Sequence, residues 1–162
     1  KETTMPLTAT RSSPLDIPTH QRCLLIAMCT PKTPRPFGEV AIPSLTSKLH
    51  LVAGRYPYIG APLALSLAAR EPWGWEPFCE LTCNYDRGMS VAIEGDEVLV
   101  KTYSENAEVA AAVVAAGYFQ PTDKRQPLNF GDLEVWKVTD KFVTEFCSAN
   151  RQWAKSPLCS QH

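Results

Sequence analysis

The sequence predicts an α+β domain: an antiparallel meander sheet of about five to six strands, packed by one small-residue helix and followed by a C-terminal amphipathic helix. Three observations support this class. Short runs after residue 49 alternate apolar residues with small or polar ones, the period of two that half-buried strands show. The connections between these runs are short, which favours antiparallel neighbours. A run of strands is followed by a helix, a strand and a helix, so the order is not the βαβ alternation of a parallel sheet.

Five runs form the expected strands of the meander. Leu49, Leu51 and Ala53 alternate with other residues in the first run, and Leu63, Leu65 and Leu67 do so in the second. A turn at Glu94-Gly95-Asp96 joins the last two runs as a hairpin. The expected strands are 49–56, 63–68, Phe78–Tyr85, Met89–Ile93 and Glu97–Tyr103, with a loop at 71–77 before the third.

The second half of the chain carries the helical patterns. Ala107 to Ala116 is nearly pure Ala and Val, which predicts a helix over 105–116 with Ser104 as the expected cap and Gly117 as the expected left-handed end. A polar loop at 123–127 and a last strand at Leu133–Thr139 follow. Asp140 is the expected cap of a final helix, whose apolar face is formed by Phe142, Phe146, Ala149 and Trp153.

The N-terminal third has a different composition. Residues 1–22 are rich in Thr, Ser and Pro and carry few large apolar groups, so we expect a flexible tail. The apolar run Cys23–Cys29 reads as a short strand or buried segment, and three prolines at 30–36 indicate a stiff linker. The expected organisation is a tail at 1–22, an apolar segment and Pro-rich linker at 23–48, a single α+β domain at 49–156 and a tail at 157–162.

Length and charge exclude several classes of protein. The 162 residues suit one domain, and no run of about 18 apolar residues predicts a membrane-spanning helix. Sixteen Lys and Arg face seventeen Asp and Glu, so the total charge gives no basis for direct nucleic-acid binding. Residues 71–108 hold nine acids but only two bases. This acidic middle is either a solvated face or a face that docks on a basic protein partner.

The six cysteines leave three alternatives open. Their density is below that of disulfide-built scaffolds, which favours buried free thiols over disulfides or metal ligands. Cys79 and Cys83 lie on one face of a predicted strand and are too far apart to bond each other. The chain has no Asn-x-Ser/Thr sequon. We therefore expect a cytoplasmic protein, with secretion as the alternative.

Two local features are candidate partner-binding sites. Trp73-Gly74-Trp75 places two large rings in a short loop, and tryptophan is enriched at the energetic centres of protein interfaces. The alternative is that both rings fold back over the sheet edge. The acids Glu94, Asp96 and Glu97 at the expected hairpin turn are the second candidate. They read as exposed partner contacts, or less favourably as ligands of a hard cation.

Motifs of catalysis and cofactor binding are missing. The sequence has no glycine-rich dinucleotide or phosphate loop, no H-E-x-x-H and no G-x-S-x-G, so no cofactor is expected. The one arrangement open to chemistry is His50 as a base beside Cys79 or Cys83 as a nucleophile, if their strands adjoin. A lone strand histidine is more often structural, and we predict no catalytic residue.

The order of motifs from Leu51 to Asp140 adds a resemblance. Thr82-Cys83-Asn84 follows a strand, Ser104-Glu105-Asn106 starts a helix and Ala115-Ala116-Gly117 ends it. This order resembles a family of small domains of unknown function found in phages, conjugative elements and the large polyvalent proteins they carry. The family has no established catalytic residues, so the resemblance implies none here.

These observations lead to one functional expectation and two alternatives. We expect a non-enzymatic, protein-binding accessory protein of a mobile genetic element, with an anti-defence or regulatory role. The alternatives are a cysteine-dependent enzyme using Cys79 or Cys83, and a secreted, disulfide-bonded binding protein.

Overall fold

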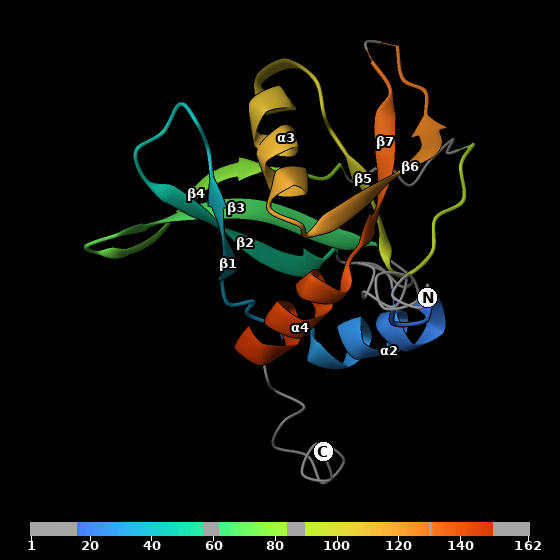
Figure 1. The fold of residues 1–162 in the computed structure, drawn as a ribbon, viewed down its shortest axis with the longest axis horizontal. Coiled ribbons are helices and arrows are strands. Elements are labelled where there is room, and N and C mark those ends of the chain that lie inside the picture. The colour runs from blue at the N-terminus through green and yellow to red at the C-terminus, as the bar shows by residue number, and fades with distance from the viewer. Residues whose placement is uncertain (1–15, 57–61, 84–89, 130, 151–162) are drawn as a thin grey trace, which may run out of the picture.

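A computed structural model describes residues 16–56, 62–83, 90–129 and 131–150, which form two antiparallel sheets and three α-helices (Figure 1). The α+β class is confirmed, but the expected single meander is replaced by a four-stranded and a three-stranded sheet. The elements in chain order are α2 (Thr19–Cys29), β1 (Phe37–Ala41), β2 (Lys48–Arg55), β3 (Leu63–Glu71), β4 (Gly74–Glu80), β5 (Glu97–Val100), α3 (Ala107–Ala115), β6 (Phe119–Gln126), β7 (Leu133–Val138) and α4 (Asp140–Ala149).

The first sheet is a meander with the order β1-β2-β3-β4. Its centre follows the predicted alternation: Leu51 pairs with Leu67 and Ala53 with Leu65, and all four side chains face the core. Strand β1 was not predicted, because it is a short run that follows the prolines of 30–36. The expected loop at 71–77 is a hairpin instead, since only its first residues turn and Gly74 already pairs with Glu71.

The second sheet has the order β5-β7-β6, so β7 lies between two strands that precede it in the chain. Two predictions are wrong here. Residues 90–93 of the expected fourth strand are not extended in a ladder, and the expected loop at 123–127 is largely the end of β6. Strand β6 lies at the sheet edge and exposes polar side chains such as Asp123, while Arg125 pairs with Glu134 of β7. The polarity of these residues therefore indicated a loop, although they form an edge strand.

A short extended segment after β4 joins the two sheets. Thr82 forms a bridge with Val100 of β5, and the Cys83 amide donates to the Leu99 carbonyl at 3.0 Å. The Thr82 hydroxyl oxygen also accepts from the Leu65 amide of β3 at 2.9 Å. The chain thus leaves the first sheet and pairs directly with the second.

Helix α2 replaces the strand that we considered for 23–29, although the segment is partly buried as expected. Arg22, Ile26 and Cys29 are its buried residues, at helical spacing, while Leu24 faces out. A short apolar run does not distinguish a buried strand from a helix, which explains the error. Helices α2 and α4 lie side by side below the sheets (Figure 1).

The other helices match the prediction except at their starts. Helix α3 packs against β1 and β6 and ends at Ala115, and Gly117 two residues later has a φ of 91°, the predicted left-handed conformation. Ser104 provides no side-chain cap, because a 3-10 turn at Ser104–Asn106 precedes the helix. Helix α4 is capped by Thr139 rather than Asp140, since the Thr139 hydroxyl accepts from the Phe142 amide at 3.3 Å. Trp153 lies outside the described residues.

The core is centred on aromatic rings that connect both sheets to α4. The Phe142 ring of α4 lies 5.2 Å from Phe37 of β1 and 5.3 Å from Phe119 of β6. Phe37 also meets Phe146 one turn further along α4, at 5.6 Å. Such aromatic pairs add about 0.5–1.5 kcal/mol each beyond the burial of their area. A residue of the segment that we had expected to be a linker is therefore part of the core.

A disulfide between Cys29 and Cys147 joins the ends of α2 and α4. The prediction of free thiols is wrong for this pair, because their helices become neighbours only in the folded chain. Cys23, Cys79 and Cys83 are free thiols, and Cys159 lies outside the described residues.

The disulfide closes a loop of 118 residues, so it restricts the unfolded chain strongly. We predict that a Cys29→Ala/Cys147→Ala variant loses about 2–5 kcal/mol of unfolding free energy in urea. Reductant should destabilise the wild type to the same extent and leave the variant unchanged. Alkylation of the denatured, unreduced chain should spare these two residues. Their full alkylation would contradict the pairing.

Candidate functional site

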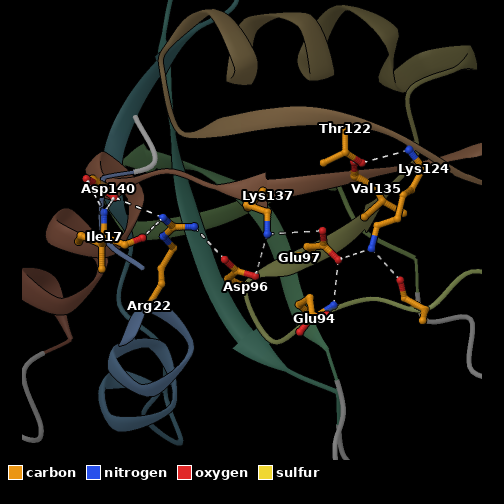
Figure 2. A network of polar contacts seen from close by, with 11 residues as sticks. Ile17, Arg22, Glu94, Asp96, Glu97, Thr122, Lys124, Val135, Lys137 and Asp140 are labelled. Atoms are coloured by element: carbon orange, nitrogen blue, oxygen red, sulfur yellow. Dashed lines mark hydrogen bonds and ion pairs between the residues drawn. The ribbon is translucent and has the colours of Figure 1, made fainter. Parts of the chain in front are cut away.

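The acids at the predicted hairpin turn belong to a buried network of charges rather than to the surface (Figure 2). Asp96 is completely buried and Glu97 nearly so, and only Glu94 is exposed. The Asp96 carboxylate accepts from Arg22 Nη1 at 2.8 Å, and Lys137 Nζ lies 3.6 Å from its other oxygen. Asp96 and Glu97 are therefore not available to a partner, and this part of the predicted site is corrected.

Arg22 connects three parts of the chain through one guanidinium group. It belongs to α2, while its partner Asp96 precedes β5 and lies 74 positions further along the chain. Its Nη2 atom donates to the Ile17 carbonyl and lies 3.7 Å from the Asp140 carboxylate at the start of α4. The Ile17 amide in turn donates to Asp140 at 3.2 Å. The network thus holds α2, the β5 entry and α4 together.

Glu97 extends the network toward β6. Its carboxylate accepts from Lys124 Nζ at 2.8 Å and from the Glu94 amide at 2.9 Å, and Lys137 Nζ lies at 3.7 Å. Burial alone would raise the pKa of Glu97, but these hydrogen bonds and cations together hold that pKa below its ordinary value. In the sequence, three neighbouring acids indicate an exposed turn. The fold instead brings three cations to two of them, from α2, β6 and β7.

The tryptophan candidate lies on the β3–β4 hairpin, which projects from the body at the left of Figure 1. Trp73 is 74% exposed, Trp75 41% and Phe78 46%. Among the described residues, only Leu24 on α2 joins them as an exposed large hydrophobic residue. Exposed aromatic residues thus gather on one element.

Each tryptophan ring is held differently. Trp75 lies on β4 opposite Arg70, and the Arg70 guanidinium sits 5.3 Å from the Trp75 ring centre. The same ring meets His50 of β2 edge-on at 5.0 Å. Trp73 stands at the turn, where its Nε1 donates to Glu76 at 2.8 Å. Trp75 therefore folds over the sheet in part, as one interpretation expected, whereas Trp73 faces out.

A cleft lies beside Trp75, between β1 and α4, and sequence reasoning did not identify it. Gly38, His50, Tyr118 and Glu145 are among its lining residues. Tyr118 donates to Glu145 at 2.6 Å, and burial together with this bond raises the pKa of Tyr118 to about 12. The Tyr118 hydroxyl approaches Gly38 so closely that a side chain there would clash. These contacts hold β1 against α4.

The pairing of His50 with a cysteine is not formed. Cys79 is opposite Leu67, on the core face of the first sheet, whereas His50 is opposite Ala68 and contacts Trp75 on the other face. His50 Nδ1 donates to the Gly38 carbonyl at 2.6 Å. Burial, with Glu105 and Glu80 nearby, raises the pKa of the Cys79 thiol, which is the opposite of an activated nucleophile.

Cys83 packs against apolar residues of the second sheet. It is half-buried against the smaller cluster of Leu99, Leu133 and Val135. Within the described part of the chain, no three His, Cys, Asp or Glu side chains come together in a way that could hold a metal ion.

The chain matches no protein-family model, no curated protein and no solved structure. The resemblance to small domains of mobile genetic elements therefore stays a prediction. Of the helices in the described ranges, none combines the length and apolar character needed to cross a bilayer.

The lowered pKa of Glu97 predicts a pH dependence of stability. The Glu97 carboxylate stabilises the fold above its unfolded pKa of about 4.3. This contribution is lost as the pH falls through the lower folded pKa. At pH 7, Glu97→Gln should lower the free energy of unfolding by about 1.5–3 kcal/mol. The deficit should shrink below about pH 4.

Urea unfolding across this pH range measures the difference. The matched control is Glu94→Gln, three residues earlier in the chain and exposed, which should change stability by under about 0.5 kcal/mol. A Glu97→Gln deficit that stays constant from pH 7 to strong acid would contradict the assignment.

Proposed function

We propose that this chain is a non-enzymatic protein-binding module and that the β3–β4 hairpin is its contact surface. The observation that carries the proposal is the gathering of Trp73, Trp75 and Phe78, all exposed, on one projecting hairpin. Large rings supply much contact area for little loss of conformational entropy, which is why they dominate interface energies. Trp75 is already oriented by Arg70 and His50, so part of that entropy is lost before binding.

The biological setting that we propose is a mobile genetic element, in which the module is an anti-defence or regulatory accessory protein acting in the cytoplasm. The support for this setting is the motif order from Thr82-Cys83-Asn84 to Ala115-Ala116-Gly117.

The second candidate is a secreted, disulfide-bonded binding protein, and one observation favours it. Cys29 and Cys147 form a disulfide, and such bonds persist in oxidising compartments. Both candidates use the same hairpin surface. The thiol state of these two cysteines, in chain recovered from its native compartment, separates them.

The cysteine-dependent enzyme is not carried forward as a proposal. Cys79 and His50 lie on opposite faces of the sheet, and the raised pKa of Cys79 opposes thiolate formation.

We predict that Trp73→Ala/Trp75→Ala weakens partner binding at least about tenfold, because truncating aromatic residues at an interface centre costs about 1–4 kcal/mol. The test is affinity capture with in-cell crosslinking, comparing this variant with the wild type by quantitative mass spectrometry. The captured partner is then purified and titrated against both chains.

The matched control is Leu24→Ala, which removes an exposed apolar side chain from α2 instead. Capture by the wild type and Leu24→Ala, but not by the tryptophan variant, supports the hairpin. Equal capture by all three chains, or no specific capture by the wild type, would remove it.

A further inference from the structure

The outer edge of β4 is open. Strand β4 is last in the order β1-β2-β3-β4, so among the described residues no strand pairs with its outer side from Gly74 to Glu80. An open edge presents unpaired backbone donors and acceptors and invites another strand. Pro77 removes one donor, as edge strands often do to limit indiscriminate pairing.

The hairpin that carries this edge is acidic as well as aromatic. The hairpin carries three acids and one base. The acids are Glu71, Glu76 and Glu80, and the base is Arg70, whose guanidinium already lies against the Trp75 ring. Glu76 and Glu80 are both exposed. A strand that binds here therefore meets aromatic rings and uncompensated carboxylates together.

A second copy of the chain does not fit this edge well. Phe78 is the extra residue of a bulge in β4, because Cys79 pairs with Leu67 and Pro77 with Ala68, so Glu76 and Glu80 lie on opposite faces of the strand. Pairing about Glu76 places the two Glu76 side chains opposite each other. Like charges directly opposite across a ladder are destabilising, so the charge pattern disfavours self-pairing and favours a cationic strand.

We infer that the open edge of β4 binds an extended, Lys- or Arg-rich segment of the partner protein, which adds as a further strand to the first sheet. Backbone hydrogen bonds along β4 supply affinity in this mode of recognition. The carboxylates of Glu76 and Glu80 select cationic side chains, and Trp73 and Trp75 contact their aliphatic stems and charged heads. This inference rests on the proposed function, and it names the chemistry of the partner.

The test is a calorimetric titration of the full chain with a peptide of Lys-Lys-Val-Val repeats, which places lysine on both faces of an added strand and is long enough to run beside the seven residues of β4. The same repeats with glutamate or with threonine in place of lysine are the acidic and neutral probes. We expect saturable binding of the lysine peptide, weaker binding at high salt and no binding of the glutamate peptide.

Two variants with the same change in charge locate the binding. Glu76→Gln/Glu80→Gln should weaken the lysine peptide at least about tenfold, the equivalent of about 1.4 kcal/mol. Gln at 76 still accepts from Trp73, so the ring stays held. Asp123→Asn/Asp132→Asn removes two exposed carboxylates of the β6–β7 region and should leave the affinity unchanged.

The remaining outcomes overturn the inference in distinguishable ways. Equal binding of the threonine peptide, insensitive to Glu76 and Glu80 but lost in Trp73→Ala/Trp75→Ala, refutes the cationic partner and leaves the proposed function standing. No binding of any peptide refutes strand addition at β4, and the capture experiment then judges the proposed function alone. A dimer in sedimentation that the Glu76→Gln/Glu80→Gln change stabilises would make the occupant a second copy.

Discussion

The buried ion pair between Arg22 and Asp96 is the constraint on which the arrangement of the molecule depends. Both side chains are fully buried, 1% and 0% exposed, and their charges meet at 2.8 Å. Removing two charges from water costs several kcal/mol per ion, so the pair is tolerated only because Lys137, Asp140 and the Ile17 carbonyl complete it. The same set of contacts fixes α2 beside α4 and fixes the entry to β5. The Cys29–Cys147 disulfide fixes the other ends of the two helices.

The same ion-pair network also determines which acidic side chains are exposed on the surface. Asp96 and Glu97 are used inside the protein, so the exposed acids of the 71–108 stretch are Glu76 and Glu80 on the β3–β4 hairpin and Glu94, Glu105 and Glu108 elsewhere among the described residues. The hairpin extends beyond the body and carries exposed rings on an open edge strand (Figure 1). A body held rigid by a disulfide, an ion-pair network and an aromatic core presents this edge in a fixed orientation, which lowers the entropic cost of binding.

Local sequence patterns predicted those elements whose conformation depends mainly on residues close by in the chain. The alternation of Leu49, Leu51 and Ala53 identified β2, and the small residues before Gly117 identified α3 with its left-handed end. Local pattern failed where a distant partner decides. Arg22 was placed in a tail because its partner Asp96 is 74 positions away, and the polar residues of β6 form a strand because β7 lies beside them. Residue type alone identified the tryptophans as candidates. The open edge of β4 beside them follows only from the order of the strands in the first sheet.

A double-mutant cycle on Arg22 and Asp96 tests this account most directly, with unfolding free energies measured in urea for Arg22→Met, Asp96→Asn and the double variant. Each single substitution leaves a buried group without its charged partner and should cost about 3–5 kcal/mol. The double variant should cost far less than the sum, giving a coupling of at least about 2 kcal/mol. Additive losses, or single substitutions that cost under about 1 kcal/mol, would show that the fold does not depend on this pair.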